Sequence, residues 1–197
     1  ETIAQKPDEA LLFDAYAEQE YLQARYRRGE NIEGLEQVLY ICPHCHKEFT
    51  MTVQNRSNIT CTACGYTEQA DCYGFLHKVG TTGQEIRRVS DWSRLIRKEI
   101  ANRIDREHLL SASAPTEIFT LDPTKHKFMP AGEGTLKVSA QGIRLHGQIQ
   151  GDPLDIRQSL VNIPSLPFSP GSHLEVQDGE NIYRCKLQQG RLAMKLI

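Results

Sequence analysis

The middle of this chain holds two closely spaced cysteine pairs, Cys42-Pro43-His44-Cys45 and Cys61-Thr62-Ala63-Cys64. Fifteen residues lie between the pairs, and this spacing predicts two facing hairpin turns that each carry two thiolates. Extended runs precede the pairs, over 37–41 and 57–60, and 47–53 is expected to return as a strand. Gly65, directly after the second pair, permits the positive φ that such a turn needs.

Four soft sulfur ligands in a tetrahedral array suit zinc and leave no open coordination position. We therefore predict a structural zinc in a rubredoxin-like zinc ribbon over 37–80, with the ligands Cys42, Cys45, Cys61 and Cys64. Rival interpretations are disulfides or a redox-active CxxC, although neither a signal peptide nor a βαβ unit is in view. The spacing alone leaves a four-cysteine iron cluster open.

The remaining candidate ligands are predicted to lie outside this site. His44 and His46 are expected to face solvent, since four cysteines complete the shell. Cys72 and Cys185 stand alone and are interpreted as small buried apolar residues.

Composition limits the classes of protein to which the chain can belong. With 39% hydrophobic and 24% charged residues, its 197 residues are typical of a globular protein. A formal net charge of -2 argues against a dedicated nucleic-acid binder. Because no long apolar run and no secretion signal are seen, we expect a cytoplasmic protein without a transmembrane segment. The chain begins at Glu1 and not at Met, so it is expected to be a mature product or a piece of a longer protein.

Residues 1–36 are predicted to form an acidic, helical N-terminal arm. Apolar residues recur at helical spacing from Ala10, and Gly29 is the expected stop. This stripe is expected to dock on the rest of the protein or on a missing domain. Its members are Leu12, Tyr16, Tyr21, Leu22 and Tyr26.

Residues 81–110 are predicted to form a basic connecting helix, helical over 91–104 with Ser90 or Asp91 as N-cap. Its apolar face is predicted to hold Trp92, Leu95, Ile96, Ile100 and Ile104. A basic patch is either a solvated polar face or a contact for lipid phosphates or another anionic surface. The patch comprises Arg87, Arg88, Arg94, Arg97 and Lys98.

Residues 111–197 are predicted to form an antiparallel β-domain, because short alternating runs are separated by turn residues. Hairpin turns are expected at Gln141-Gly142, Asp178-Gly179 and Gln189-Gly190. A small barrel or sandwich is the expected fold. Strands are predicted over 117–121, 134–140, 142–149, 155–162, 173–177, 181–187 and 191–197.

The β-domain offers no credible catalytic motif, so no catalytic residue is assigned. His173 and Asp178 have the H-x4-D spacing of glycerolipid acyltransferases. We interpret this match as coincidental, because it lies on a strand that runs into a turn and not in a pocket.

The order of these features resembles a known family. The resemblance is to the accessory region that follows the catalytic domain in bacterial 1-acyl-sn-glycerol-3-phosphate acyltransferases. It is carried by the stretch 29–51, the second CxxC, Ser90-Asp91-Trp92 with the following Arg97-Lys98-Glu99-Ile100, and 132–147. The resemblance implies that the catalytic His and Asp lie in a preceding domain, which this chain lacks. Only the four zinc ligands carry over.

The expectation is therefore an α+β, non-catalytic zinc-binding accessory region of a phospholipid-synthesising acyltransferase. Its β-domain is expected to be pleckstrin-homology-like or GRAM-like. It would position the enzyme peripherally at the inner face of the membrane or on a partner, first of all its own catalytic domain. The alternative is a zinc ribbon that binds nucleic acid or a protein assembly, but only Lys47, Arg56 and Lys78 give the ribbon positive charge.

Overall fold

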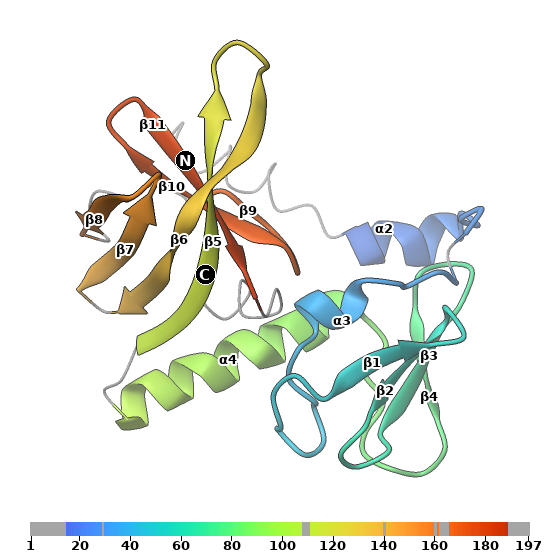
Figure 1. Cartoon of the computed structure of the whole chain (residues 1–197). Coiled ribbons are helices and arrows are strands. Elements are labelled where there is room, and N and C mark those ends of the chain that lie inside the picture. Colours follow the sequence, from blue (N-terminus) through green and yellow to red (C-terminus); the bar gives the residue numbers. More distant parts are fainter. Residues whose placement is uncertain are drawn as a thin grey trace, which may run out of the picture.

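The computed structural model describes residues 15–28, 30–107, 111–139, 141–159, 161 and 166–188. These residues form a mixed fold with two antiparallel sheets and three helices (Figure 1). Within this part of the chain, no helix is both long enough and apolar enough to cross a membrane.

The first sheet carries the two cysteine turns. Its four antiparallel strands lie in chain order: β1 (Met51–Gln54), β2 (Asn58–Cys61), β3 (Thr67–Ala70) and β4 (Leu76–Val79). The predicted extended run over 37–41 is wrong, because the short helix α3 (Leu35–Val38) precedes the first cysteine pair. A single bridge, Ile41 to Glu48, closes the first turn, and the regular returning strand begins only at Met51.

Helix α4 (Val89–Glu107) packs on this sheet and shares its core. Trp92 and Ile96 are buried, as predicted, but Leu95 is 47% exposed and its assignment to the buried face is wrong. Ser90 and Asp91 lie inside the helix and not at its N-cap. The core residues around Trp92 include Leu39, Met51, Ile59, Tyr66 and Leu76.

Helix α2 (Ala15–Leu22) is the described part of the predicted N-terminal helix. It ends well before the expected stop at Gly29, which lies outside the described residues, as do Ala10 and Leu12. Tyr16 packs on Phe75 with the ring centroids 5.7 Å apart. The other described members of the predicted apolar stripe, Tyr21, Leu22 and Tyr26, are exposed and not buried as a docked face would be, although the Tyr26 ring lies beside Gly74.

The second sheet has seven antiparallel strands in the order β8-β7-β6-β5-β11-β10-β9. It bends around one core, in which Ile118, Leu136, Leu145, Leu174 and Cys185 are buried. The strands are β5 (Ser111–Asp122), β6 (Lys127–Ser139), β7 (Gly142–Ile149), β8 (Asp152–Gln158), β9 (Phe168–Ser169), β10 (His173–Asp178) and β11 (Asn181–Leu187).

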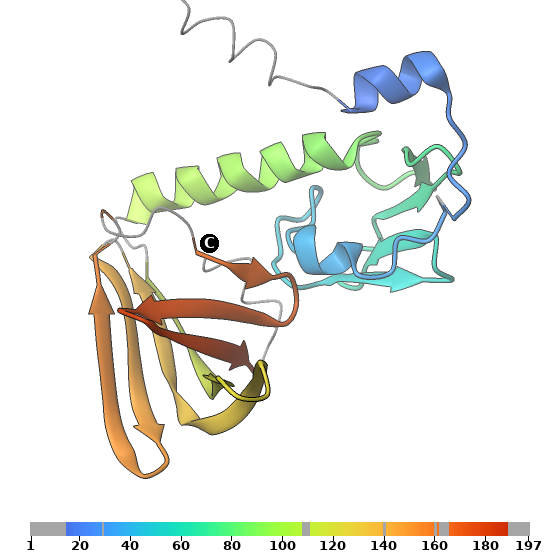
Figure 2. The same cartoon turned by 90° about the horizontal axis from the view of Figure 1, so that it is seen from above.

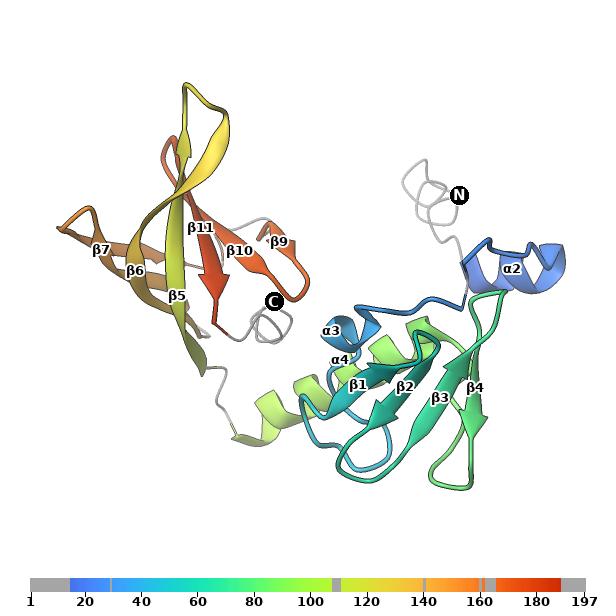
Figure 3. The same ribbon diagram turned by 45° about the vertical axis from the view of Figure 1, so that its right-hand side comes forward.

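The outcome for the predicted strands is mixed. The hairpins at Gly142 and Gly179 form as expected, and both glycines have positive φ. Strands β5 and β6 are far longer than predicted and make a hairpin that projects from the sheet (Figure 3). Strand β8 ends at Gln158, so the predicted extension is wrong at Ser159 and Val161. Residues 160 and 162, the strand over 191–197 and the turn at Gln189-Gly190 lie outside the described residues.

The sheet is not a closed barrel within the described ranges, because its edge strands β8 and β9 do not pair. The side chain of Gln158 on β8 donates a hydrogen bond to the Gln177 carbonyl on β10, so the two sides of the sheet approach each other. Helix α4 leads from the ribbon to this β-domain (Figure 2). The two buried cores share no residue.

Candidate metal centre

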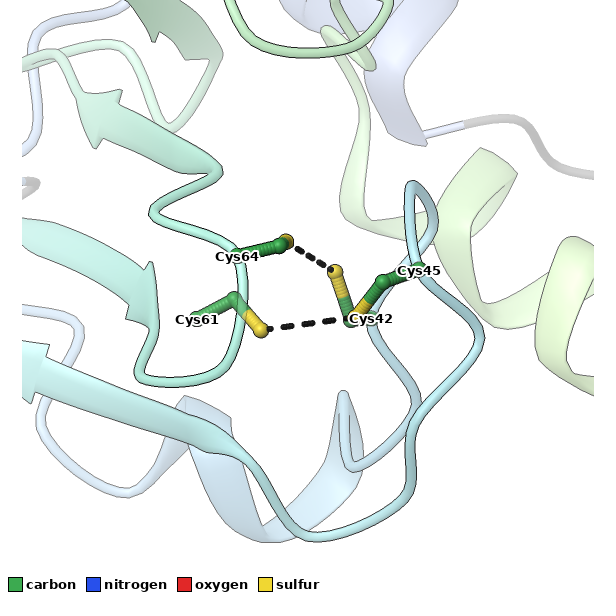
Figure 4. Close-up of side chains that lie close together, drawn as sticks. All are labelled: Cys42, Cys45, Cys61 and Cys64. Atoms are coloured by element: carbon green, nitrogen blue, oxygen red, sulfur yellow. Dashed lines mark hydrogen bonds between the residues drawn. The ribbon is translucent and has the colours of Figure 1, made fainter.

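Four thiol groups converge at the end of the ribbon sheet (Figure 4). The Sγ atoms of Cys42 and Cys64 are 3.6 Å apart, and those of Cys45 and Cys61 are 3.7 Å apart. All four sulfurs lie within 4.8 Å of one another. A tetrahedron with Zn–S bonds of about 2.3 Å needs sulfur atoms about 3.8 Å apart. The cluster therefore can hold a metal ion, and its dimensions fit zinc.

The two cysteine turns have matching backbones. In the first, the amide of His46 donates to the Cys42 carbonyl (3.0 Å); in the second, the amide of Gly65 donates to the Cys61 carbonyl (2.9 Å). Both donors have positive φ, 56° at His46 and 74° at Gly65. The predicted positive φ at Gly65 is confirmed, and the first turn accepts a histidine in the same conformation.

Hydrogen bonds favour negative charge on one of the sulfurs. Burial acts to raise the pKa of Cys61, but the Thr50 hydroxyl, 3.2 Å from its Sγ, and the amides of Ala63 and Cys64 outweigh it and lower the pKa to about 6. Burial instead raises the pKa of Cys42. Four thiolates this close together, two of them buried, would need a compensating cation, which a divalent metal supplies.

The shell of donors is complete without other side chains. Cys42 and Cys61 are buried, whereas His44 and His46 are exposed, as predicted. With four sulfur ligands and no position left for water, a metal here would stabilise the fold and would not activate a substrate.

Helix α4 is attached directly to the first cysteine turn. The indole nitrogen of Trp92 donates to the carbonyl of Ile41, the residue before Cys42, over 2.9 Å. Farther along the helix, Arg103 donates to the Glu48 carboxylate (2.6 Å) and to the His46 carbonyl (3.1 Å). A metal that fixes the turn therefore also fixes the helix.

A buried carboxyl group lies behind the second cysteine turn, and the sequence did not reveal it. The Tyr66 hydroxyl contacts both Glu68 Oε1 and, at 2.9 Å, the Gln84 carbonyl. The amide of Ile86 also donates to Glu68 Oε1. The single hydroxyl proton of Tyr66 cannot be donated fully to two acceptors, so a proton on Glu68 would supply the missing donor. Burial raises the pKa of Glu68, which favours that protonated form.

The predicted basic patch does not form a uniform cationic face. Arg87 and Arg88 approach Glu20 of α2, at 3.4 and 2.7 Å, and Arg94 pairs with Asp91 at 2.8 Å. Arg97 and Lys98 are exposed on α4. These two carry the positive charge best placed for an external anion, and the lipid contact stays a prediction.

The remaining sequence candidates lie away from the metal cluster. Cys185 is buried, which raises its pKa to about 12, whereas Cys72 is only half-buried and its predicted full burial is wrong. His173 and Asp178 lie at opposite ends of β10, and their separation by five residues places them on opposite faces of the sheet. They do not form a catalytic pair.

Comparison with known proteins does not identify a family. No protein-family model and no curated protein matches the chain. One similar solved structure is the Ran-binding domain from the nuclear complex component Nup2 of Ashbya gossypii, with 15% identity and a TM-score of 0.33. The match covers 44% of this chain and 90% of that one. Similarity at this level carries no functional information.

Proposed function

We propose that this chain is a non-catalytic, zinc-stabilised accessory region of a phospholipid-synthesising acyltransferase. The convergence of four sulfurs at tetrahedral spacing carries the proposal, because it accounts for how the small ribbon is stabilised. The acyltransferase assignment rests on the sequence resemblance described above. The preceding catalytic domain would be the first partner.

The proposed task is to position the enzyme at an anionic membrane. Arg97 and Lys98 on α4 would contact lipid phosphates, each cation being worth about 1 kcal/mol near an anionic surface. The β-domain would serve as a second positioning element of pleckstrin-homology-like or GRAM-like form. Its seven antiparallel strands around a single core support that form.

The alternative is a module that binds nucleic acid or a protein assembly through the ribbon. The cations of the ribbon give it little support, since Arg56 pairs with Glu33 and Lys78 donates to the Gly83 carbonyl. A salt-dependent mobility shift with single-stranded RNA or duplex DNA would favour this alternative.

Metal analysis followed by vesicle co-sedimentation tests the proposal. We expect one zinc per chain, and binding that requires phosphatidic acid and weakens as salt rises. Replacing Arg94, Arg97 and Lys98 by glutamine should weaken that binding. The lipid part of the proposal fails if sedimentation is indifferent to phosphatidic acid, and the zinc part fails if the purified protein holds no metal.

A further inference from the structure

An exposed segment at the end of α2 combines aromatic and cationic side chains. Tyr21 is 85% exposed, Leu22 57% and Tyr26 53%, and such a cluster of large exposed side chains is more informative than a single one. Three exposed arginines alternate with them or follow. We call this set the arginine-tyrosine surface: Tyr21, Leu22, Arg25, Tyr26, Arg27 and Arg28.

The positive charge of this surface is not neutralised within the described chain. None of its three arginines makes an ion pair with another described residue, whereas neighbouring acids are engaged elsewhere. Glu20 pairs with Arg87 and Arg88, and Glu33 pairs with Arg56. Glu30 is the one carboxylate that lines the same 290 Å³ hollow as the three arginines. Three guanidinium groups therefore outnumber one carboxylate.

Hydrogen bonds fix the backbone segment that carries these side chains. The amide of Tyr26 donates to the Cys72 carbonyl over 2.9 Å. The buried Gln19 side chain donates to the carbonyls of Ala24 and Tyr73, at 2.6 and 3.0 Å. These bonds fasten the segment after α2 to the loop between β3 and β4, and Figure 3 shows the two side by side. The surface is formed in advance and need not fold on binding.

We infer that the arginine-tyrosine surface rests on an anionic lipid bilayer. Tyrosine prefers the interface between water and lipid, and arginine reaches phosphate oxygens from there. A bilayer requires no complementary shape, whereas a stable protein interface takes about 20 to 30 residues from each side. Three large apolar side chains in one short segment are far fewer than that. This inference rests on the membrane part of the proposed function and adds a second contact site, separate from the one on α4.

Two glutamine variants of the full chain test the assignment. One replaces Arg25, Arg27 and Arg28, and its matched control replaces the ribbon cations Lys47, Arg56 and Lys78 with the same change in charge. With vesicles containing phosphatidic acid, we expect the first variant to lose about a hundredfold in partition coefficient, about fivefold for each guanidinium. The control should lose less than about fivefold. Equal binding by the first variant and the wild type would overturn the inference.

A second measurement detects insertion directly. The protein has one tryptophan, Trp92, which is buried and gives an internal reference. In Tyr21→Trp, brominated lipids should quench the added emission and leave that of Trp92 unchanged. Vesicle binding without quenching would overturn the inference while leaving the proposed membrane role intact. Quenching together with full sensitivity to the arginine replacements, but none to the α4 replacements, would support the inference and remove α4 from the proposed function.

Discussion

Cys61 joins the metal cluster to the ribbon sheet, because it is both a ligand and the last residue of β2. We expect Cys61→Ser to lose zinc and to unfold the ribbon core, since structural zinc contributes about 10 to 16 kcal/mol to the folding of small fingers. Metal analysis and thermal melting measure both effects. Cys72→Ser is the control: Cys72 lies outside the cluster, so this variant should keep its zinc. Unchanged metal content in Cys61→Ser would contradict the assignment.

Glu68 should make stability depend on pH. Its pKa is raised in the folded protein, so its contribution to stability is complete below the ordinary value of about 4.5 and is lost as pH rises through the raised pKa. Glu68→Gln cannot ionise and retains the metal site. We therefore expect the free energy of unfolding of the wild type to fall relative to Glu68→Gln as pH rises above the ordinary pKa of about 4.5. Urea titrations at several pH values measure the difference, and parallel curves would refute it.

Residues that act through local spacing were predictable, and those that act through distant contacts were not. The four cysteines and the positive φ of Gly65 follow from a few consecutive residues. Thr50 reaches Cys61 only through the pairing of β1 with β2. Glu68 meets the Ile86 amide because a loop folds back, and no sequence pattern encodes that contact.

At the scale of elements, Trp92 decides how α4 is held. Trp92→Phe leaves the Ile41 carbonyl without its donor and opens a small void, so we expect the free energy of unfolding to fall by about 1 to 3 kcal/mol. Leu95→Ala, on the exposed side of the same helix, should cost under about 1 kcal/mol. Chemical denaturation measures both. Equal costs would mean that the indole does not anchor the helix.

Elements with strong periodicity were predicted better than those without it. Helix α4 and the hairpin of β10 and β11 have regular apolar spacing and clear turn residues. Large alternating side chains are absent from the first half of β5, which holds Ala112, Ala114 and Pro115, and from the glycine positions of β6. The predicted strands were therefore shorter than β5 and β6. The apolar stripe predicted for the N-terminal helix gave a wrong expectation of burial, because apolar spacing does not distinguish a docked face from an exposed one.

On the scale of the whole molecule, the two separate cores imply two transitions. We expect a zinc chelator to unfold the ribbon with α3 and α4, since the metal is their main source of stability. The β-domain has its own apolar core and should persist. Amide spectra recorded before and after chelation would separate the two sets of residues. Simultaneous loss of both sets would show that the parts fold as one unit.

The order of the parts along the chain was predictable, but their packing was not. The helix predicted as a separate connection shares its core with the ribbon: Trp92 and Ile96 belong to the same buried cluster as Met51, and Trp92 packs edge-on against Tyr66. The sequence contains these apolar residues without indicating which surface they cover. Similarly, the alternation of the β-domain did not reveal that β8 and β9 are left unpaired among the residues that the structure describes.

Because α4 is attached to the ribbon, a rotation of the ribbon is transmitted to the far end of the helix. A helix of 19 residues is about 28 Å long at about 1.5 Å per residue. Trp92, near its start, and Arg103, eleven residues later, both hold α4 to the first cysteine turn, and its last residues lead into β5. Because the helix is held at two points, a rotation of the turn by about 10° would carry the whole helix with it and would move its far end by about 5 Å over that length. A small distortion of the cysteine turns would thus reach the β-domain as a displacement larger than a water molecule.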